Sequence, residues 1–145
     1  MSNHPRVSLG MPVYNGENYI VATLDSLLAQ TYTDFELIIC DNASTDGTEA
    51  ICRDYAARDP RVRYHRNETN IGASANYNLT FELARGDYFK WAAHDDLCAP
   101  TYIERCVEAL DRDPDVVLAY TQAKAIDDQG NVVKVYPGKH HFASP

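Results

Sequence analysis

Two adjacent carboxylates, Asp95 and Asp96, follow a short aromatic and apolar run, Tyr88 to Ala92, and precede the expected start of a helix. Carboxylate oxygens are ligands that hard cations such as Mg²⁺ and Mn²⁺ prefer. Open α/β sheets bind their ligands beyond the carboxyl ends of the strands. The pair therefore predicts a divalent-metal site with Asp95 and Asp96 as ligands. Favourable charge at a helix N-terminus is the alternative explanation of an isolated acidic pair.

Two further loops carry polar residues at the ends of expected strands. Tyr14 and Asn15 follow the first strand, Asp41 and Asn42 follow the second, and His94 stands directly before the acidic pair. In a parallel sheet these loops converge at one edge. The chain has no GxGxxG opening its first helix and no GxxxxGK[ST], which disfavours a dinucleotide-binding Rossmann site and a P-loop. A phosphate group must therefore be held in another way.

The hydrophobic pattern predicts the elements that position these loops. Short apolar runs predict strands, and apolar residues at helical spacing predict amphipathic helices between them. Four strand–helix units in series predict an α/β fold with a mostly parallel, doubly wound sheet and helices on both faces. The expected strands are 7–13, 35–40, 61–65 (a half-buried edge), 88–92, 116–120 and 132–136. One helix is expected from Asn18, its N-cap, to Gln30, and a second after the Asp46/Glu49 capping pair. A third is expected from about Ala75 to a Gly86 cap, and a fourth after Pro100.

Composition limits the class of protein. A chain of 145 residues suits one domain, and a net charge of −8 argues against a nucleic-acid surface. An acidic protein can still bind a nucleotide through helix N-termini, backbone amides and a bridging metal. The four cysteines lack disulfide or zinc spacing and are expected to be buried thiols. With no signal peptide and no membrane-spanning apolar run, we expect a cytoplasmic protein.

An ordered set of motifs resembles the inverting family-two glycosyltransferases. Each motif alone is weak, but their order and spacing match the family over nearly the whole sequence. The resemblance implies a GT-A fold, with residues 1–145 forming a single nucleotide-sugar-binding domain from the N-terminal part of a longer enzyme. The matching segments are 7–15, 27–32, 35–48, 70–72, Asn78, 84–88 and 94–96.

The resemblance also implies roles for individual residues. Residues matching Pro12 and Tyr14 pack against base and ribose, and the carboxylate matching Asp41 accepts a hydrogen bond from the base. Because a carboxylate only accepts, Asp41 suits an imide N–H such as that of uracil or thymine, and a UDP-sugar is favoured. The implied binding set is completed by Asn15, Asn78, His94 and Asp95, with Mn²⁺ or Mg²⁺ as cofactor.

Two positions depart from the family pattern. Ala93 replaces the first Asp of the Asp-x-Asp metal motif, which leaves Asp95, then Asp96, as the expected ligands. Tyr77 replaces a frequent Arg, so Arg66 or Lys90 is the alternative source of positive charge near the diphosphate.

The implied reaction is displacement at the anomeric carbon with inversion, in which a carboxylate base takes the proton of the acceptor hydroxyl. That base is expected beyond residue 145, since Asp127 and Asp128 precede a Gln-Gly sequence typical of a solvated hairpin turn. The acceptor is expected to be a glycan or lipid-linked sugar in polysaccharide biosynthesis, with membrane association only through other parts of the parent protein.

Two alternatives belong to other classes. A non-catalytic nucleotide-sugar-binding or protein-interaction module is suggested by Ala93 and by the absence of a recognisable base. A nucleotidyltransferase is weaker, because Tyr14-Asn15-Gly16-Glu17 stands where a Gly-rich phosphate loop with a basic residue is needed.

Overall fold

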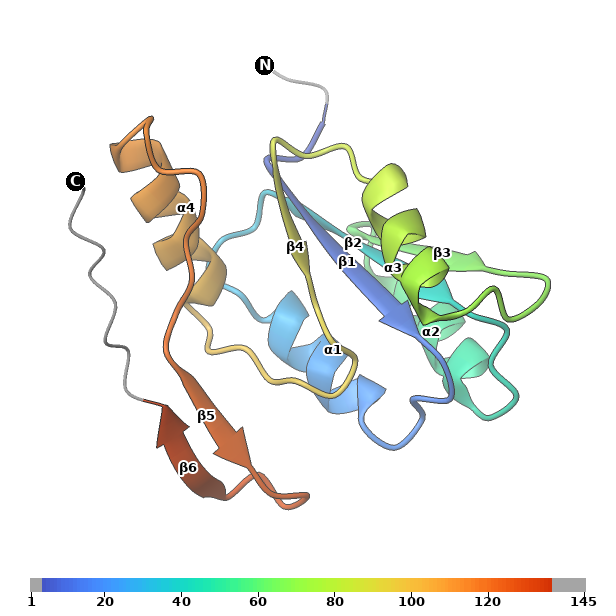
Figure 1. Ribbon diagram of the computed structural model, residues 1–145. Helices are drawn as coiled ribbons and strands as arrows, with labels where there is room; N and C mark the ends of the chain where they lie inside the picture. The colour runs from blue at the N-terminus through green and yellow to red at the C-terminus, as the bar shows by residue number, and fades with distance from the viewer. Residues whose placement is uncertain (1–3, 137–145) are drawn as a thin grey trace. The chain divides into compact units, whose positions relative to one another are not determined.

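The computed structural model describes residues 4–136, which fall into two compact units, residues up to Thr101 and residues from Tyr102 onward. The first unit contains four strands and three helices (Figure 1). In chain order they are β1 (Val7–Val13), α1 (Ile20–Leu28), β2 (Phe35–Asp41), α2 (Thr48–Arg58), β3 (Val62–Arg66), α3 (Ala73–Glu82) and β4 (Tyr88–Trp91).

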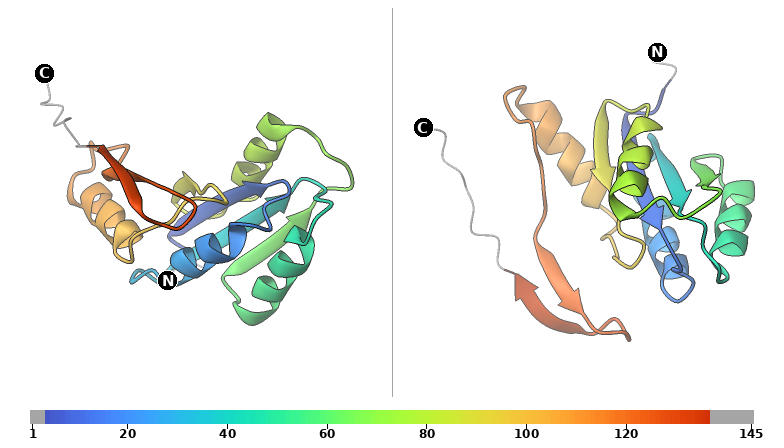
Figure 2. Two further views of the ribbon diagram at one scale, coloured as in Figure 1. Left: turned by 90° about the horizontal axis from the view of Figure 1, so that it is seen from below. Right: turned by 45° about the vertical axis from the view of Figure 1, so that its right-hand side comes forward.

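The four strands form one parallel sheet in the order β3-β2-β1-β4. β1 and β2 lie in the centre and every one of their residues is buried, as expected for strands covered on both faces. Helices α1 and α2 cover one face and α3 covers the other (Figure 2). The predicted α/β class, with a parallel sheet and helices on both faces, is confirmed.

The apolar side chains that face the sheet are the ones that the periodicity predicted. Ile20, Leu24 and Leu27 of α1 are almost fully buried, and Leu37 and Ile39 of β2 are completely buried.

The cysteine prediction is half right: Cys40 and Cys52 are buried, and burial raises the pKa of each thiol to about 12, whereas Cys98 and Cys106 are partly exposed. All four are free thiols.

Three predicted helix boundaries are corrected. Asn18 is not the N-cap of α1, because the N–H groups of Tyr19 and Ile20 bond to the carbonyl of Gly16 instead. The N-cap of α2 is Gly47 and not Asp46, although Asp46 Oδ1, one residue earlier, accepts a hydrogen bond from Thr48 N at 3.0 Å. Glu49 pairs with Arg53 and Arg66 and completes no capping box.

Gly86 is the third correction. α3 ends at Glu82, so Gly86 does not cap it. Gly86 instead lies against β1, where a Cβ would come 2.7 Å from Ser8 N. Because glycine has no side chain, the backbone at Gly86 can pack directly against the backbone of β1.

The second unit contains α4 (Tyr102–Arg112) and an antiparallel hairpin of β5 (Ala123–Ile126) and β6 (Val132–Tyr136). The predicted strand over residues 116–120 is wrong. Those residues pair with no strand in the described chain, and Val117 and Leu118 are 91% and 73% exposed. An apolar run has strand propensity, but a strand exists only where a neighbour completes its hydrogen bonds.

The expected turn between β5 and β6 is confirmed. Asp127 accepts hydrogen bonds from Gln129 N and Asn131 N, and Gly130 takes a φ of 82°. These contacts hold the pKa of the Asp127 carboxyl below its usual range, first through the Asn131 side chain.

Within the described chain, no helix is long and apolar enough to span a bilayer.

A buried carboxylate fastens the loop after α3 to the sheet. Glu36 of β2 is 2% exposed and accepts hydrogen bonds from Ser8 Oγ, Arg63 Nη1 and Arg85 Nη2, each at 2.7 Å. Burial alone would raise the pKa of Glu36, but hydrogen bonds from Arg85, Ser8 and Arg63 outweigh it and lower the pKa from 4.5 to about 2.

We predict that Glu36→Gln lowers the free energy of unfolding by about 2–3 kcal/mol, below the roughly 3–5 kcal/mol of a fully buried pair because both guanidinium groups reach water. The Glu36 contribution is fully present above the unfolded pKa of 4.5 and is lost as pH falls toward the folded pKa of about 2. Urea unfolding at pH 7 and pH 3 measures both effects.

Glu108→Gln is the matched control, because among the described residues Glu108 pairs with Arg105 alone and both side chains are exposed. It should change the unfolding free energy by no more than about 0.5 kcal/mol. Equal effects of the two substitutions at pH 7 would contradict a structural role for Glu36.

Candidate functional site

A cavity of about 220 Å³ opens at the carboxyl edge of the parallel sheet. Its walls come from the end of β1, from the residue after β2, from the loop before α3 and its first turn, and from the loop after β4. The lining residues are Pro12, Val13, Tyr14, Asn42, Asn70, Ala73, Asn76, Tyr77 and His94. The loops after β1, β2 and β4 therefore meet at one edge of the sheet, as the sequence predicted.

Of the predicted binding residues, Pro12, Tyr14 and His94 line this cavity. Asn15 lies beside it with a φ of 52°, and its Oδ1 accepts a hydrogen bond from Thr45 N at 2.8 Å. Asn15 thereby joins the loop after β1 to the loop after β2. Asn78 is exposed on α3 and is not among the lining residues, whereas Asn76 and Tyr77 of the same helix are.

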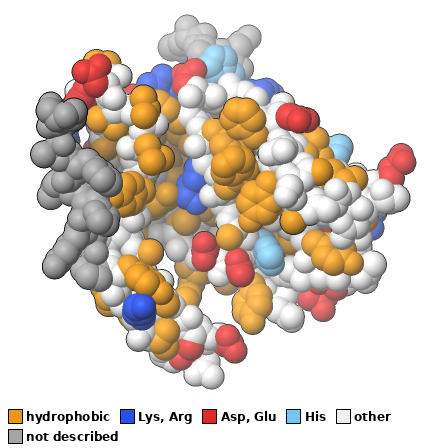
Figure 3. All heavy atoms as spheres, in the orientation of Figure 1, with side chains coloured by type: hydrophobic (Ala, Val, Ile, Leu, Met, Phe, Trp, Pro, Cys, Tyr) orange, Lys and Arg blue, Asp and Glu red, His pale blue; other side chains and the backbone are white. Residues whose placement is uncertain are grey.

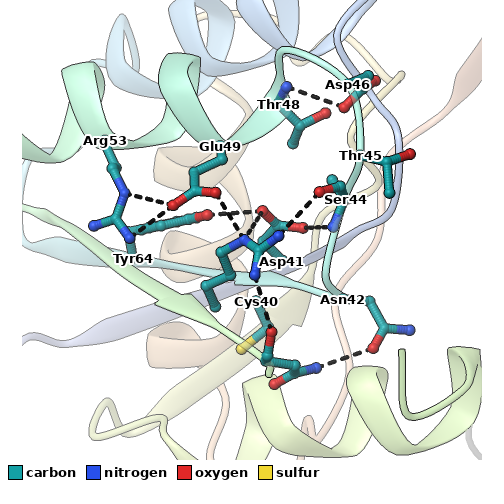
Figure 4. A network of polar contacts seen from close by, with 12 residues as sticks. Cys40, Asp41, Asn42, Ser44, Thr45, Asp46, Thr48, Glu49, Arg53 and Tyr64 are labelled. Atoms are coloured by element: carbon teal, nitrogen blue, oxygen red, sulfur yellow. Dashed lines mark hydrogen bonds and ion pairs between the residues drawn. The ribbon is translucent and has the colours of Figure 1, made fainter. Parts of the chain in front are cut away.

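Asp41 is not at the cavity surface. Its side chain is completely buried, with Oδ1 accepting from Ser44 N at 2.8 Å and Oδ2 accepting from the Tyr64 hydroxyl at 2.7 Å (Figure 4). Burial, then the hydrogen bond to Asp41, raises the pKa of Tyr64 well above its usual range. Asp41 holds the loop that follows β2, and it is Asn42 that this loop brings to the cavity.

Four asparagines join the segments that surround the cavity. Asn42 follows β2, Asn67 and Asn70 lie between β3 and α3, and Asn76 lies on α3. Their side chains are linked by three hydrogen bonds of 2.9–3.0 Å, and Asn76 Nδ2 also donates to the Cys40 carbonyl at 2.8 Å. Sequence reasoning missed this network. The density of Asn between residues 67 and 78 was the available signal.

The loop after β4 is anchored through its backbone. Thr23 Oγ1 of α1 donates to the His94 carbonyl at 2.9 Å, and a Cβ on Gly16 would come 2.7 Å from the His94 ring. Asp95 and Asp96 follow, both exposed and without a hydrogen bond or ion pair to any described residue. On the face in Figure 3, acidic side chains lie near a histidine at the surface.

The donor set fits a divalent cation that also binds its substrate. Over residues 4–136 there is no group of three or more His, Cys, Asp or Glu side chains able to enclose a metal. Mg²⁺ is commonly held by one or two carboxylates together with substrate phosphates, and not by an all-protein cage. Two unpaired carboxylates next to a cavity-lining histidine meet that requirement.

No Lys or Arg belongs to the cavity lining. Arg66 Nε lies 2.9 Å from Glu49 Oε2, and Arg66 Nη2 donates to the Ser44 carbonyl at 3.1 Å, so its guanidinium is engaged beside Asp41. Lys90 Nζ donates to the Trp91 carbonyl at 2.7 Å. Neither expected cation faces the cavity, and an anion there would depend on N–H donors and a metal.

Comparison with known proteins identifies the family. Residues 8–142 match the model of the family described as glycosyl transferase family 2. The chain belongs to this family. It is 37% identical over 129 residues to chondroitin synthase of Escherichia coli, covering 89% of this chain and 19% of that protein. It is 39% identical over 113 residues to the putative glycosyltransferase EpsE of Bacillus subtilis, covering 77% and 41%.

Solved glycosyltransferase structures share the fold. S. aureus TarS in complex with UDP-GlcNAc matches with a TM-score of 0.69 and 27% identity, covering 74% of this chain and 31% of that one. The mannosyltransferase PcManGT from Pyrobaculum calidifontis, in complex with GDP-Man and Mn²⁺, matches with a TM-score of 0.69 and 28% identity, covering 79% and 34%. The family-two glycosyltransferase with a GT-A-type fold is confirmed. The chain spans less than half the length of these proteins.

We predict that Gly16→Ala displaces His94, because the new methyl group would meet the imidazole ring and Val13 at 2.7–2.8 Å. Overpacking of this kind costs about 1–3 kcal/mol, and the His94 ring resonances should shift in NMR spectra. Gly47→Ala is the control, since its Cβ would meet only the end of the flexible Glu17 side chain. Unchanged His94 resonances in Gly16→Ala would refute this packing.

Proposed function

We propose that this chain is the donor-binding domain of an inverting, metal-dependent glycosyltransferase that uses a nucleoside diphosphate-sugar, with a UDP-sugar favoured. One observation carries the proposal: two unpaired carboxylates, Asp95 and Asp96, follow His94 in the wall of a cavity at the carboxyl edge of the sheet. Support comes from TarS, seen with UDP and with UDP-GlcNAc, and from PcManGT, seen with GDP-Man and Mn²⁺.

The nucleoside is proposed to occupy the cavity. Pro12 and Tyr14 offer an apolar surface to base and ribose, and His94 lies toward ribose or phosphate. Asn15 and Asp41 hold the loops after β1 and β2 in place. Their direct contacts with the donor stay predictions. Asn78, which does not line the cavity, is left with a role at its rim.

Asp95, with Asp96 beside it, is proposed to hold Mn²⁺ or Mg²⁺ together with the donor diphosphate. A divalent cation there supplies positive charge that offsets the charge developing on the leaving diphosphate. The chain itself contributes N–H groups of the cavity wall and the N-terminus of α3, whose first residue, Ala73, lines the cavity. Since no basic side chain lines the cavity, we expect nucleotide binding to depend strongly on the cation.

Inverting transfer needs a base that removes the acceptor hydroxyl proton as the bond to the anomeric carbon forms. Asp127 is committed to its own turn and so is not that base. We propose that residues 1–145 form one functional part of a longer enzyme, that the base and the acceptor site lie beyond residue 145, and that this part alone does not turn over. A glycan or lipid-linked acceptor in polysaccharide assembly, on the cytoplasmic side, is the proposed setting.

One observation favours a second function. Ala93 stands in the place of a motif carboxylate, and no group of three or more His, Cys, Asp or Glu side chains among the described residues could hold a metal. A non-catalytic nucleotide-sugar-binding module would keep the cavity and lack turnover. Donor hydrolysis or transfer by the full-length protein, abolished by Asp95→Asn, would eliminate this second function.

We predict that calorimetry detects binding of UDP in the presence of Mn²⁺ and little binding in EDTA. Asp95→Asn should weaken Mn²⁺-dependent UDP binding by at least about tenfold, because it removes a ligand charge from the metal. The matched control is Asp34→Asn, an exposed aspartate before β2 at the opposite edge of the sheet, which should stay within about twofold. If neither UDP, dTDP nor GDP binds with Mn²⁺, the proposed function is wrong.

A further inference from the structure

One side of α1 is polar although much of it is buried. Thr23 is 1% exposed, Gln30 just beyond the end of the helix is 4% exposed, and Ser26 between them is partly buried. Their spacing of three and then four residues places them on the same side of the helix. These three residues form a polar row. Buried polar side chains are costly unless they are paired, so the partners of the polar row indicate its role.

Thr23 and Ser26 fix two points of the loop after β4 through its backbone. Thr23 Oγ1 donates to the His94 carbonyl at 2.9 Å, and Ser26 Oγ accepts from Cys98 N at 3.2 Å. The hydroxyl hydrogen of Ser26 is donated to the Thr23 carbonyl at 2.9 Å, which leaves the Ser26 oxygen to accept from the loop. Because these contacts involve no loop side chain, they set the position of the loop backbone itself.

Two further contacts fix the end of the same loop. Gln30 Nε2 donates to the Ala99 carbonyl at 2.8 Å and to the Ser26 carbonyl at 3.2 Å, which joins the loop to the helix. Thr31 N donates to the Pro100 carbonyl at 2.9 Å. The order of these contacts shows that the loop runs beside α1 in the same direction as the helix (Figure 1).

Asp95 and Asp96 lie between the first two of these contacts. Together with Leu97 they are exposed, and none of the three has a hydrogen bond or ion pair to any described residue. The backbone on either side of them, at His94 and Cys98, is held against α1. The two carboxylates are therefore open to a ligand while the ends of their segment are fixed.

Fixing the segment in advance favours binding. A ligand that must order a flexible segment loses affinity to the conformational entropy of that segment. Within the described residues, no group of three or more His, Cys, Asp or Glu side chains could hold a metal. A cation at Asp95 and Asp96 would thus gain little help from other side chains in ordering the loop. The contacts with α1 supply the order that a closed metal site would otherwise impose.

We propose that Thr23 is a positioning residue, which with Ser26 and Gln30 holds the Asp95–Asp96 loop in the conformation that binds a divalent cation together with a nucleoside diphosphate. The proposal rests on the proposed function, because it concerns the loop that carries the proposed ligands. Thr23 does not line the cavity and acts through the carbonyl of His94, the residue directly before the two carboxylates.

Thr23→Val tests the proposal, because it removes the hydroxyl and nearly keeps the size of the side chain. In the presence of Mn²⁺, calorimetry should show UDP binding weakened about 3- to 10-fold, the value of one net hydrogen bond. Thr23→Ser keeps the hydroxyl and should bind UDP within about twofold of the wild-type affinity. Loss in the valine variant and rescue in the serine variant would assign the effect to the hydrogen bond.

A second measurement needs neither nucleotide nor cation. NMR relaxation of the unliganded chain should show lower order parameters for the Asp95 and Asp96 amides in Thr23→Val and wild-type values in Thr23→Ser. A general loss of stability would not single out these two amides.

Tyr55→Phe is the matched control. Tyr55 of α2 donates its hydroxyl to Asp25 Oδ1 of α1 at 2.6 Å, so this variant also removes one hydrogen bond to α1 but leaves the loop contacts intact. It should keep UDP affinity within about twofold. An equal loss of affinity in Tyr55→Phe and Thr23→Val would mean that α1 supports binding only through overall stability, and would refute the positioning role.

Should Thr23→Val fail to fold in thermal unfolding experiments, Ser26→Ala takes its place. Ser26 is partly exposed, and its loss releases Cys98 N at the other end of the segment, so UDP binding should weaken about threefold. Wild-type UDP affinity in a folded Thr23→Val variant, or in Ser26→Ala where it replaces that variant, would overturn this inference alone. Absence of Mn²⁺-dependent binding of any nucleotide to the wild-type chain would overturn the proposed function and this inference together.

Discussion

The amide oxygen of Asn42 is the contact on which the arrangement of the cavity depends. It accepts a hydrogen bond from the backbone before α3 and another from Asn67 after β3, although it belongs to the loop after β2. A polar atom buried this deeply must be paired, and here its partners come from segments 25 and 29 residues away. The need to satisfy one buried group therefore brings three loops together.

Both edges of the sheet contain buried polar groups that need hydrogen-bond partners. At the carboxyl edge, the buried carboxylate of Asp41 accepts hydrogen bonds from Ser44 and Tyr64, and the neutral amides of the asparagine network satisfy one another. At the amino edge, the buried carboxylate of Glu36 is compensated by Arg63, Arg85 and Ser8 and keeps nothing for a ligand. Between them β1 and β2 are entirely buried. Buried carboxylates thus fasten a loop at each end of β2, and at the carboxyl edge neutral amides join further loops.

The chain belongs to the glycosyl transferase family 2. The chain is acidic and its cavity lining includes no basic side chain, so the proposed anionic donor would have to be neutralised by something other than Lys or Arg. Asp95 and Asp96, unpaired within the described residues, are suited to bind a cation that does so. Because both side chains are exposed to water, their lack of protein partners costs no stability. The same exposure makes them accessible to a cation.

The sequence by itself determined the order of the elements in the first unit, the parallel sheet and the meeting of the loops after β1, β2 and β4, because periodicity and strand-end polarity are local properties. It also determined the family, through the order of its motifs. It failed at residues 116–120, where strand formation depends on a partner that local pattern does not reveal.

Only the tertiary structure decided between Asp41 and Asn42. Neighbouring residues at the end of a strand point to opposite sides, so a difference of one position decides which of these two buried residues lines the cavity. The buried position of Asp41 depends on its hydrogen bonds to Tyr64 and Ser44. The orientation of the Asn42 amide depends on its hydrogen bonds to Asn67 and Ile71. These partners are distant in sequence or are placed by the geometry of the loop. Hydrogen bonds between distant segments are the physical reason that motif order predicted the convergence of the loops but not which of their residues line the cavity.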